Sequence, residues 1–327
     1  MQGLKGLPMF HLAHKCCLLL LLFAVSTTKA DEVSDWLKQM GCDSLLALHL
    51  EEQLLSSALG DKTEIAAELA NIYAFMLGKT IDGSEEDILV RVNSMIESMP
   101  DVMTTDLELQ LLRASYLSSE LLLEKYRLRI ISKEKAGDAI KTLRDTAKRL
   151  SSIRSSLLRK SNHSKTFSER DSNRLGLATS LNAWASYYLA WYAKDVGLAA
   201  EAAELFASIL EAEKALLNEV SLDLRQEEYG ARALLGIALS KSISKGHSVS
   251  KGWFEELKDE STWDGVKHQR LAWEIAVDVD HQQWSDLSAL NFEQISKPNV
   301  LRLIAGHGFE QRADEDAKKA GKSAINQ

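Results

Sequence analysis

Apolar residues recur at three- and four-residue intervals along almost the whole chain, and this spacing predicts helices. No segment alternates between apolar and polar residues over the length that a strand needs. The sequence therefore predicts an all-α fold. The expected helices cover residues 45–55, 63–77, 84–100, 105–131, 132–158, 173–196, 198–218, 225–244, 249–259, 266–287 and 298–310.

Residues 1–30 follow a different pattern, which is typical of a secretory signal peptide. They hold three lysines and no acid, and Cys16 to Val25 is an unbroken apolar run. Small residues follow at Thr28 and Ala30, where a signal peptidase would cut. The run is shorter than the ~20 residues of a membrane-spanning helix. We expect an exported protein, periplasmic or extracellular once the segment is removed; the alternative is a chain anchored by an uncleaved segment.

The remaining chain is expected to divide at a polar, aperiodic break. We predict an N-terminal helical lobe over 31–160, a polar loop or seam over 161–172 and a C-terminal helical lobe over 173–311. The charged residues of 312–327 are expected to form a disordered tail or linker. No later stretch approaches 18 consecutive apolar residues, so we expect no transmembrane segment in the mature chain.

One segment carries a spacing that resembles the tetratricopeptide repeat, namely Leu189, Ala190, Gly197, Ala202 and Phe206. In that pattern small residues lie where two helices touch, a glycine lies at the turn and an aromatic ring fills the groove between neighbours. The match is partial, because alanine occupies position 193, where the family usually has tyrosine, and it covers about 30 of the 327 residues.

The resemblance implies stacked antiparallel helical hairpins, a tetratricopeptide-like α-solenoid; the alternative is a non-repetitive helical bundle. A solenoid offers an extended concave surface that binds protein segments without chemistry. We therefore expect a non-catalytic binding or scaffolding module with a protein or peptide partner.

Composition narrows the expected partners and cross-links. The chain has 39 basic and 47 acidic residues, a net charge of −8, and the signal peptide holds three of the lysines. An acidic protein lacks the basic face that nucleic acids require, so we expect no nucleic-acid partner. Of three cysteines only Cys42 lies beyond residue 30, so we expect no internal disulfide.

A dense aromatic stripe has two interpretations. Trp184, Tyr187, Tyr188, Trp191 and Tyr192 recur at helical spacing and share one face. They either line a surface that grips a partner or pack in the core between two neighbouring helices. As sugar platforms they would support the alternative function, an exported carbohydrate-active enzyme of the α/α-toroid type.

Catalytic and metal-binding patterns are weak. Glu274, Asp278 and His281 share one helix face, but a metal site needs a second element, and none can be chosen from the sequence. A solvated acidic face is the expected interpretation. Hydrolase, metalloprotease, phosphate-loop and dinucleotide motifs are absent from the sequence. We therefore expect no catalytic residue, no cofactor and no metal.

Overall fold

The structure is a computed structural model that describes residues 30–57, 59–79, 87–88, 90–92, 94, 104–163, 167–289 and 298–325. Every regular element in these ranges is a helix, which confirms the all-α class. The signal peptide expected over 1–30 lies outside them except for its last residue. The elements are α2 (Ala30–Gln39), α3 (Asp43–Ser56), α4 (Leu59–Lys79), α6 (Thr105–Arg127), α7 (Lys133–His163), α8 (Glu169–Ala193), α9 (Val196–Ile209), the 3₁₀ helix η2 (Leu222–Gln226), α10 (Glu228–Lys245), α11 (His247–Glu256), α12 (Asp264–Asp280), α13 (Trp284–Ser288) and α14 (Pro298–Ile325).

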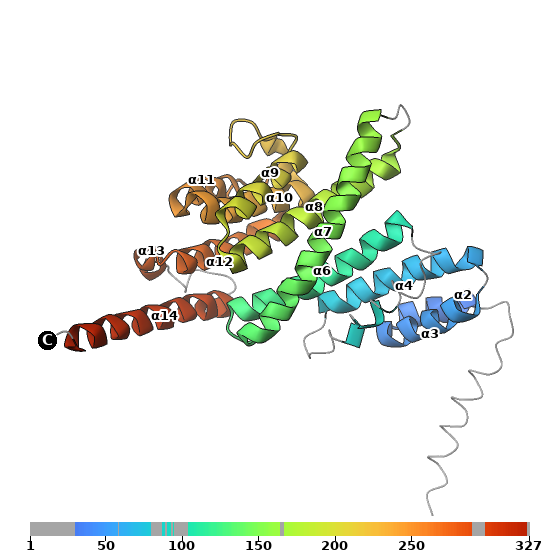
Figure 1. Ribbon diagram of the computed structural model, residues 1–327, viewed down its shortest axis with the longest axis horizontal. Coiled ribbons are helices and arrows are strands. Elements are labelled where there is room, and N and C mark those ends of the chain that lie inside the picture. Colours follow the sequence, from blue (N-terminus) through green and yellow to red (C-terminus); the bar gives the residue numbers. More distant parts are fainter. Residues whose placement is uncertain are drawn as a thin grey trace, which may run out of the picture.

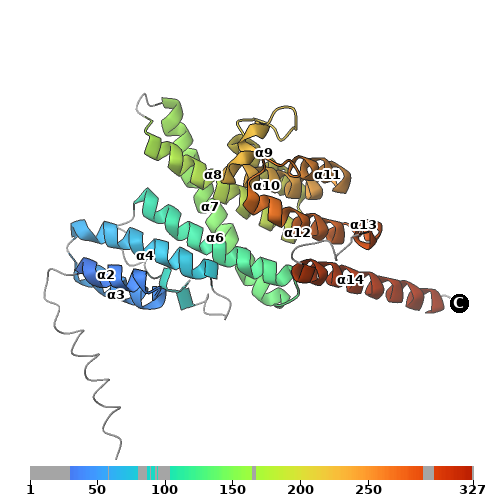
Figure 2. The same cartoon turned by 180° about the vertical axis from the view of Figure 1, so that it is seen from behind.

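Successive helices pack against one another along an elongated molecule. Figures 1 and 2 show α2, α3 and α4 at one end and α14 projecting from the other. Helix α8 contacts α7 and α9, its neighbours in sequence, and also α6 and α10. It is therefore enclosed by four helices and lies at the centre of the fold.

Two large apolar cores share helix α6. The smaller core joins α2, α3 and α4 to one face of α6 through Leu107 and Leu111. The larger core joins the other face of α6, through Leu112 and Tyr116, to α7–α12. Leu117 packs against both. The boundary between the two cores thus runs along α6, and α7 packs with the helices that follow it.

Helix covers much of the polar break expected over 161–172. Helix α7 continues to His163, and α8 begins at Glu169 because the Ser168 hydroxyl accepts a hydrogen bond from the Asp171 amide at 3.1 Å. Lys160, in the last turn of α7, lies 2.5 Å from the Asp171 carboxylate. This ion pair ties the two helix ends together, so polar composition here marks a capped helix junction.

A second ion pair ties the same junction to α6. The Arg174 guanidinium spans both carboxylate oxygens of Asp106, at 2.5 and 2.6 Å. Hydrogen bonds from Arg174 lower the pKa of Asp106 to about 2, although its partial burial opposes this. The start of α6 and the start of α8 are thereby held together.

The C-terminal residues expected as a tail form part of α14, which continues to Ile325. Alanine and lysine are frequent there and favour helix intrinsically. Arg312 and Asp316 also face each other one turn apart, at 3.8 Å. A charged composition alone therefore did not separate a tail from an exposed helix.

The turn between α8 and α9 differs in detail from the repeat pattern. Lys194, with φ of 56°, makes the left-handed turn after α8. Asp195 then caps α9 by accepting a hydrogen bond from the Leu198 amide at 3.0 Å. Gly197 lies inside the first turn of α9. The glycine is therefore not the residue that makes the turn.

Phe206 joins three helices of the larger core. Its ring is fully buried and meets Trp184 of α8 edge-on, with the ring centroids 5.0 Å apart. On its other side the ring lies against Gly236 of α10, where any side chain would overlap it. The absence of a Cβ at Gly236 lets α9 and α10 approach closely.

Within the described ranges, no helix is both long enough and apolar enough to cross a bilayer. Cys42, the one cysteine in those ranges, is a half-buried free thiol. No disulfide therefore cross-links this part of the fold, and its stability depends on the packing of its helices.

Replacing Gly236 by alanine tests the close approach at Phe206. The added Cβ would overlap a ring that is enclosed on all sides, so we expect the free energy of unfolding to fall by about 1–3 kcal/mol. Urea denaturation followed by circular dichroism measures this.

Gly197→Ala is the matched control. Its Cβ would meet only Asp195 Oδ1, at 3.4 Å, so we expect a gain of up to about 1 kcal/mol. A Gly236→Ala variant as stable as Gly197→Ala would contradict the packing described.

Candidate functional site

A groove of about 1040 Å³ lies over α8, between α7 on one side and α9 on the other. It forms because α7 and α9 both pack on α8 but not closely on each other. The side chains at its border come from these three helices and from the residues after α9. They include Ile140, Arg144, Ala147, Ser151, Arg154, Asn182, Ser186, Leu189, Tyr192, Leu198, Glu201, Glu204, Ser208 and Glu213.

Part of the floor of the groove, which α8 forms, is polar. Asn182 and Ser186 lie one turn apart on α8 and are 6% and 7% exposed. Neither side chain forms a hydrogen bond with another described residue. Buried polar groups normally have partners, from the protein or from water. The side-chain amide of Asn182 offers donors and an acceptor together, so it can pair with a peptide group that enters the groove.

The two walls carry opposite charge. On α7, Arg144 and Arg154 belong to a stripe at three- and four-residue spacing. On the opposite side, Glu201 and Glu204 occupy one face of α9, and Glu213 follows it. Among the described residues, neither arginine forms an ion pair. A ligand between the walls would therefore meet available cations on one side and carboxylates on the other.

The structure divides the aromatic stripe unequally. Trp184, Tyr187, Tyr188 and Trp191 are at most 7% exposed and belong to the larger core. Tyr192 is partly buried and lines the groove. Four of the five rings face the core because α8 packs against α6 and α10 on that side.

The repeat-like positions also lie mainly in packing interfaces. Ala190, Ala202 and Phe206 are fully buried where α8, α9 and α10 meet. Leu189 is 9% exposed and contributes an apolar patch to the groove. Gly197 lies near the N-terminus of α9. These residues thus position the groove walls, and Leu189 alone among them borders it.

A cation whose side chain is only 10% exposed, that of Arg127, lies against the end of α8. The Arg127 guanidinium stacks between Trp191 and Trp273, 4.2 and 4.9 Å from their ring centroids. It donates hydrogen bonds to Tyr187 at 2.9 Å and to Glu124 at 3.1 Å. The cation thereby joins α6, α8 and α12.

The surroundings of Arg127 keep it charged. Burial alone would lower the pKa of its guanidinium, but the surrounding charges, Glu124 first and then Tyr187 and Asp280, together outweigh burial and raise the pKa. Burial in turn raises the pKa of Tyr187 to about 12. Sequence reasoning missed Arg127, because a basic residue in the last turn of a helix is ordinarily exposed; the two tryptophans that enclose it lie far away in the sequence.

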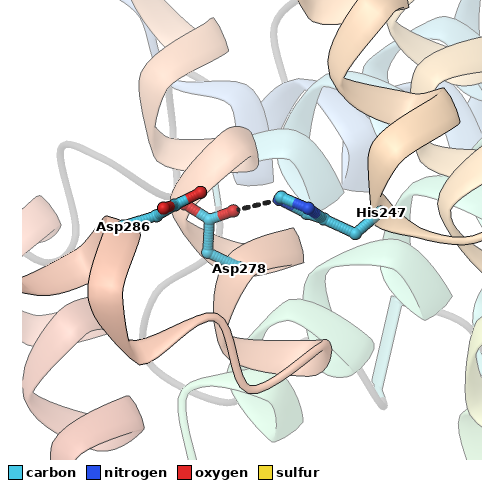
Figure 3. A group of neighbouring side chains, drawn as sticks. All are labelled: His247, Asp278 and Asp286. Carbon is cyan, nitrogen blue, oxygen red and sulfur yellow. Dashed lines mark hydrogen bonds and ion pairs between the residues drawn. The ribbon is translucent and has the colours of Figure 1, made fainter.

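Away from the groove, the structure brings together three side chains of the types that can act as metal ligands. His247, Asp278 and Asp286 converge from different elements, as Figure 3 shows. Of the acidic face expected on one helix, only Asp278 belongs to this group. It is 7% exposed, so the solvated surface expected there is wrong at this residue. Glu274 instead pairs with Arg270.

Replacing Arg127 by alanine is expected to lower the free energy of unfolding by about 3–5 kcal/mol, because Glu124 and Tyr187 would lose a buried partner. Arg113→Ala is the control, since Arg113 is exposed on the same helix; we expect a change within about 0.5 kcal/mol. Chemical denaturation of both variants measures the difference. Equal stabilities would show that Arg127 does not join the three helices.

Comparison with known proteins adds no relative. No protein-family model matches the chain, and searches of the curated proteins and of the solved structures found no match. The likeness to tetratricopeptide repeats therefore rests on the five residues that carry its spacing.

Proposed function

We propose that this chain is a non-catalytic binding module that holds an extended segment of a protein or peptide in the groove over α8. The polar floor carries the proposal. Asn182 and Ser186 are more than nine-tenths buried, face a groove of about 1040 Å³ and have no hydrogen-bond partner among the described side chains and backbone. An extended peptide supplies the amide groups that such a floor can pair with.

The charged walls support an oriented ligand. Arg144 and Arg154 favour a carboxylate on the α7 side, and Glu201 and Glu204 favour a cation on the α9 side. The patch formed by Leu189 and Tyr192 gives an apolar side chain a place between them. The proposed ligand is therefore a segment with an acidic residue, an apolar residue and a basic residue.

The stacking of successive helices is what a helical-repeat scaffold would provide, and we include the tetratricopeptide-like solenoid in the proposal. The carbohydrate-active alternative has less support. It relied on an aromatic surface, and Tyr192 is the member of the stripe that borders the groove. No observation favours it over peptide binding.

We further propose that the protein acts outside the cytoplasm, after removal of residues 1–30. The apolar run from Cys16 to Val25 and the small residues Thr28 and Ala30 support this. The first described helix begins at Ala30, so cleavage after Ala30 would leave the folded part whole apart from one terminal residue.

Export is tested by expressing the full chain in a secreting host and measuring the mass of the released protein. We expect the released protein to begin at Asp31. Ala30→Arg should prevent this cleavage, because the peptidase accepts small residues at that position. A membrane-bound product that retains residues 1–30 would favour the anchored alternative instead.

Peptide binding is tested by selecting displayed random peptides on the full chain and measuring their affinities by fluorescence anisotropy. We expect selected peptides to combine acidic and basic residues. Asn182→Ala and Arg144→Ala should each weaken their binding about tenfold, the loss expected for a hydrogen bond to a charged or buried group.

Arg113→Ala is the control for the peptide measurement, since it removes an exposed arginine outside the groove. It should leave the affinity unchanged. Selected peptides that bind Arg144→Ala and Asn182→Ala as tightly as the unaltered chain would rule out the groove as the binding site. Failure to enrich any peptide would contradict the proposed function itself.

A further inference from the structure

His247, Asp278 and Asp286 come from three consecutive helices that meet at one point. His247 is the first residue of α11, Asp278 lies in the last turn of α12, and Asp286 belongs to the short helix α13. Their ligand atoms all lie within 4.8 Å of one another. In Figure 3 the imidazole and the two carboxylates point toward a common centre.

Asp286 is not needed to hold the His247 and Asp278 side chains together. His247 Nε2 lies 2.7 Å from Asp278 Oδ1, a hydrogen bond that is sufficient to link α11 to α12. Asp286 makes a long contact with Lys251 Nζ, at 3.4 Å. A purely structural tether therefore requires His247 and Asp278 but does not require Asp286.

The group is accessible from solvent. It borders a cavity of about 360 Å³ that Ser250 and Glu274 also line. Three cations line the same cavity, and each has a carboxylate partner: Lys251 with Asp286, Lys258 with Glu255 and Arg270 with Glu274. A hydrated ion can thus reach the two aspartates, and among the described basic residues it competes with the exposed Lys251 for Asp286.

We propose that His247, Asp278 and Asp286 bind a single divalent first-row transition metal ion, with Zn²⁺ as the best probe. One imidazole nitrogen and two carboxylate oxygens are ligands that Zn²⁺ accepts at close range. The imidazole favours Zn²⁺ over Mg²⁺ and Ca²⁺, which prefer oxygen ligands alone. Three protein ligands leave a coordination position for water or for a ligand group on the cavity side.

The metal would also strengthen this end of the fold. The three ligands belong to α11, α12 and α13, so an ion held among them links all three helices, whereas the hydrogen bond links two. The proposal stands apart from the groove over α8, because none of the three residues borders that groove.

Isothermal titration of Zn²⁺ into the full, untagged and chelator-treated chain tests the site. We expect one Zn²⁺ bound through this site and a Zn²⁺ affinity about tenfold or more lower in Asp286→Asn. That variant keeps the hydrogen bond between His247 and Asp278, so its fold should be unchanged by circular dichroism. His247→Ala should show the same loss, and Mg²⁺ should not compete.

His307→Ala is the matched control, because His307 forms a comparable pair with Glu310, at 3.2 Å, elsewhere in the described chain. It should bind Zn²⁺ as the unaltered chain does. Co²⁺ gives a second readout: visible bands without a thiolate charge-transfer band exclude Cys42 as the ligand. No Zn²⁺ binding, or equal Zn²⁺ affinity in Asp286→Asn and the unaltered chain, would overturn the site.

Discussion

The enclosure of α8 is the constraint on which the rest of the structure depends. Four helices surround it, so nearly every side chain from Ala178 to Trp191 is buried. Polar atoms in such surroundings normally find partners in the protein or in a cavity, although Trp184 Nε1 has none among the described residues. Tyr187 and Tyr188 find them in Arg127 and Glu120. The side chains of Asn182 and Ser186 face the gap between α7 and α9, and this contrast makes that gap the best candidate for binding.

The same enclosure explains the buried cation. Trp191 lies in the larger core near the end of α8, and its indole nitrogen donates a hydrogen bond to Asp280 at 2.9 Å. Arg127 fills the space beneath it and supplies charge-assisted hydrogen bonds to two neighbours. The groove, the cation and the close contact of Phe206 with Gly236 are therefore three consequences of packing one helix on all sides.

The all-α fold could be predicted because helical periodicity is a local property of the sequence. Helix ends that depend on caps and ion pairs were harder to predict. Ser168 and Lys160 stabilise a helix junction within a polar stretch, and Lys194, not Gly197, makes the turn between α8 and α9. The candidate sites were harder still. Asn182 is a candidate binding residue because its side chain is buried, and burial depends on the tertiary fold. His247 and Asp278 form a hydrogen bond although they lie 31 positions apart in the chain. No spacing rule within one helix reports such pairs.

Hydrogen exchange of the native full chain, read by mass spectrometry for each helix, tests most directly whether α8 is the central element. If α8 is the central element, amides from Ala178 to Trp191 exchange only through global unfolding and are the slowest in the described part of the chain. The exposed end of α14 should exchange far faster. Amides of α8 that exchange as fast as those of α14 would show that α8 is not the central element.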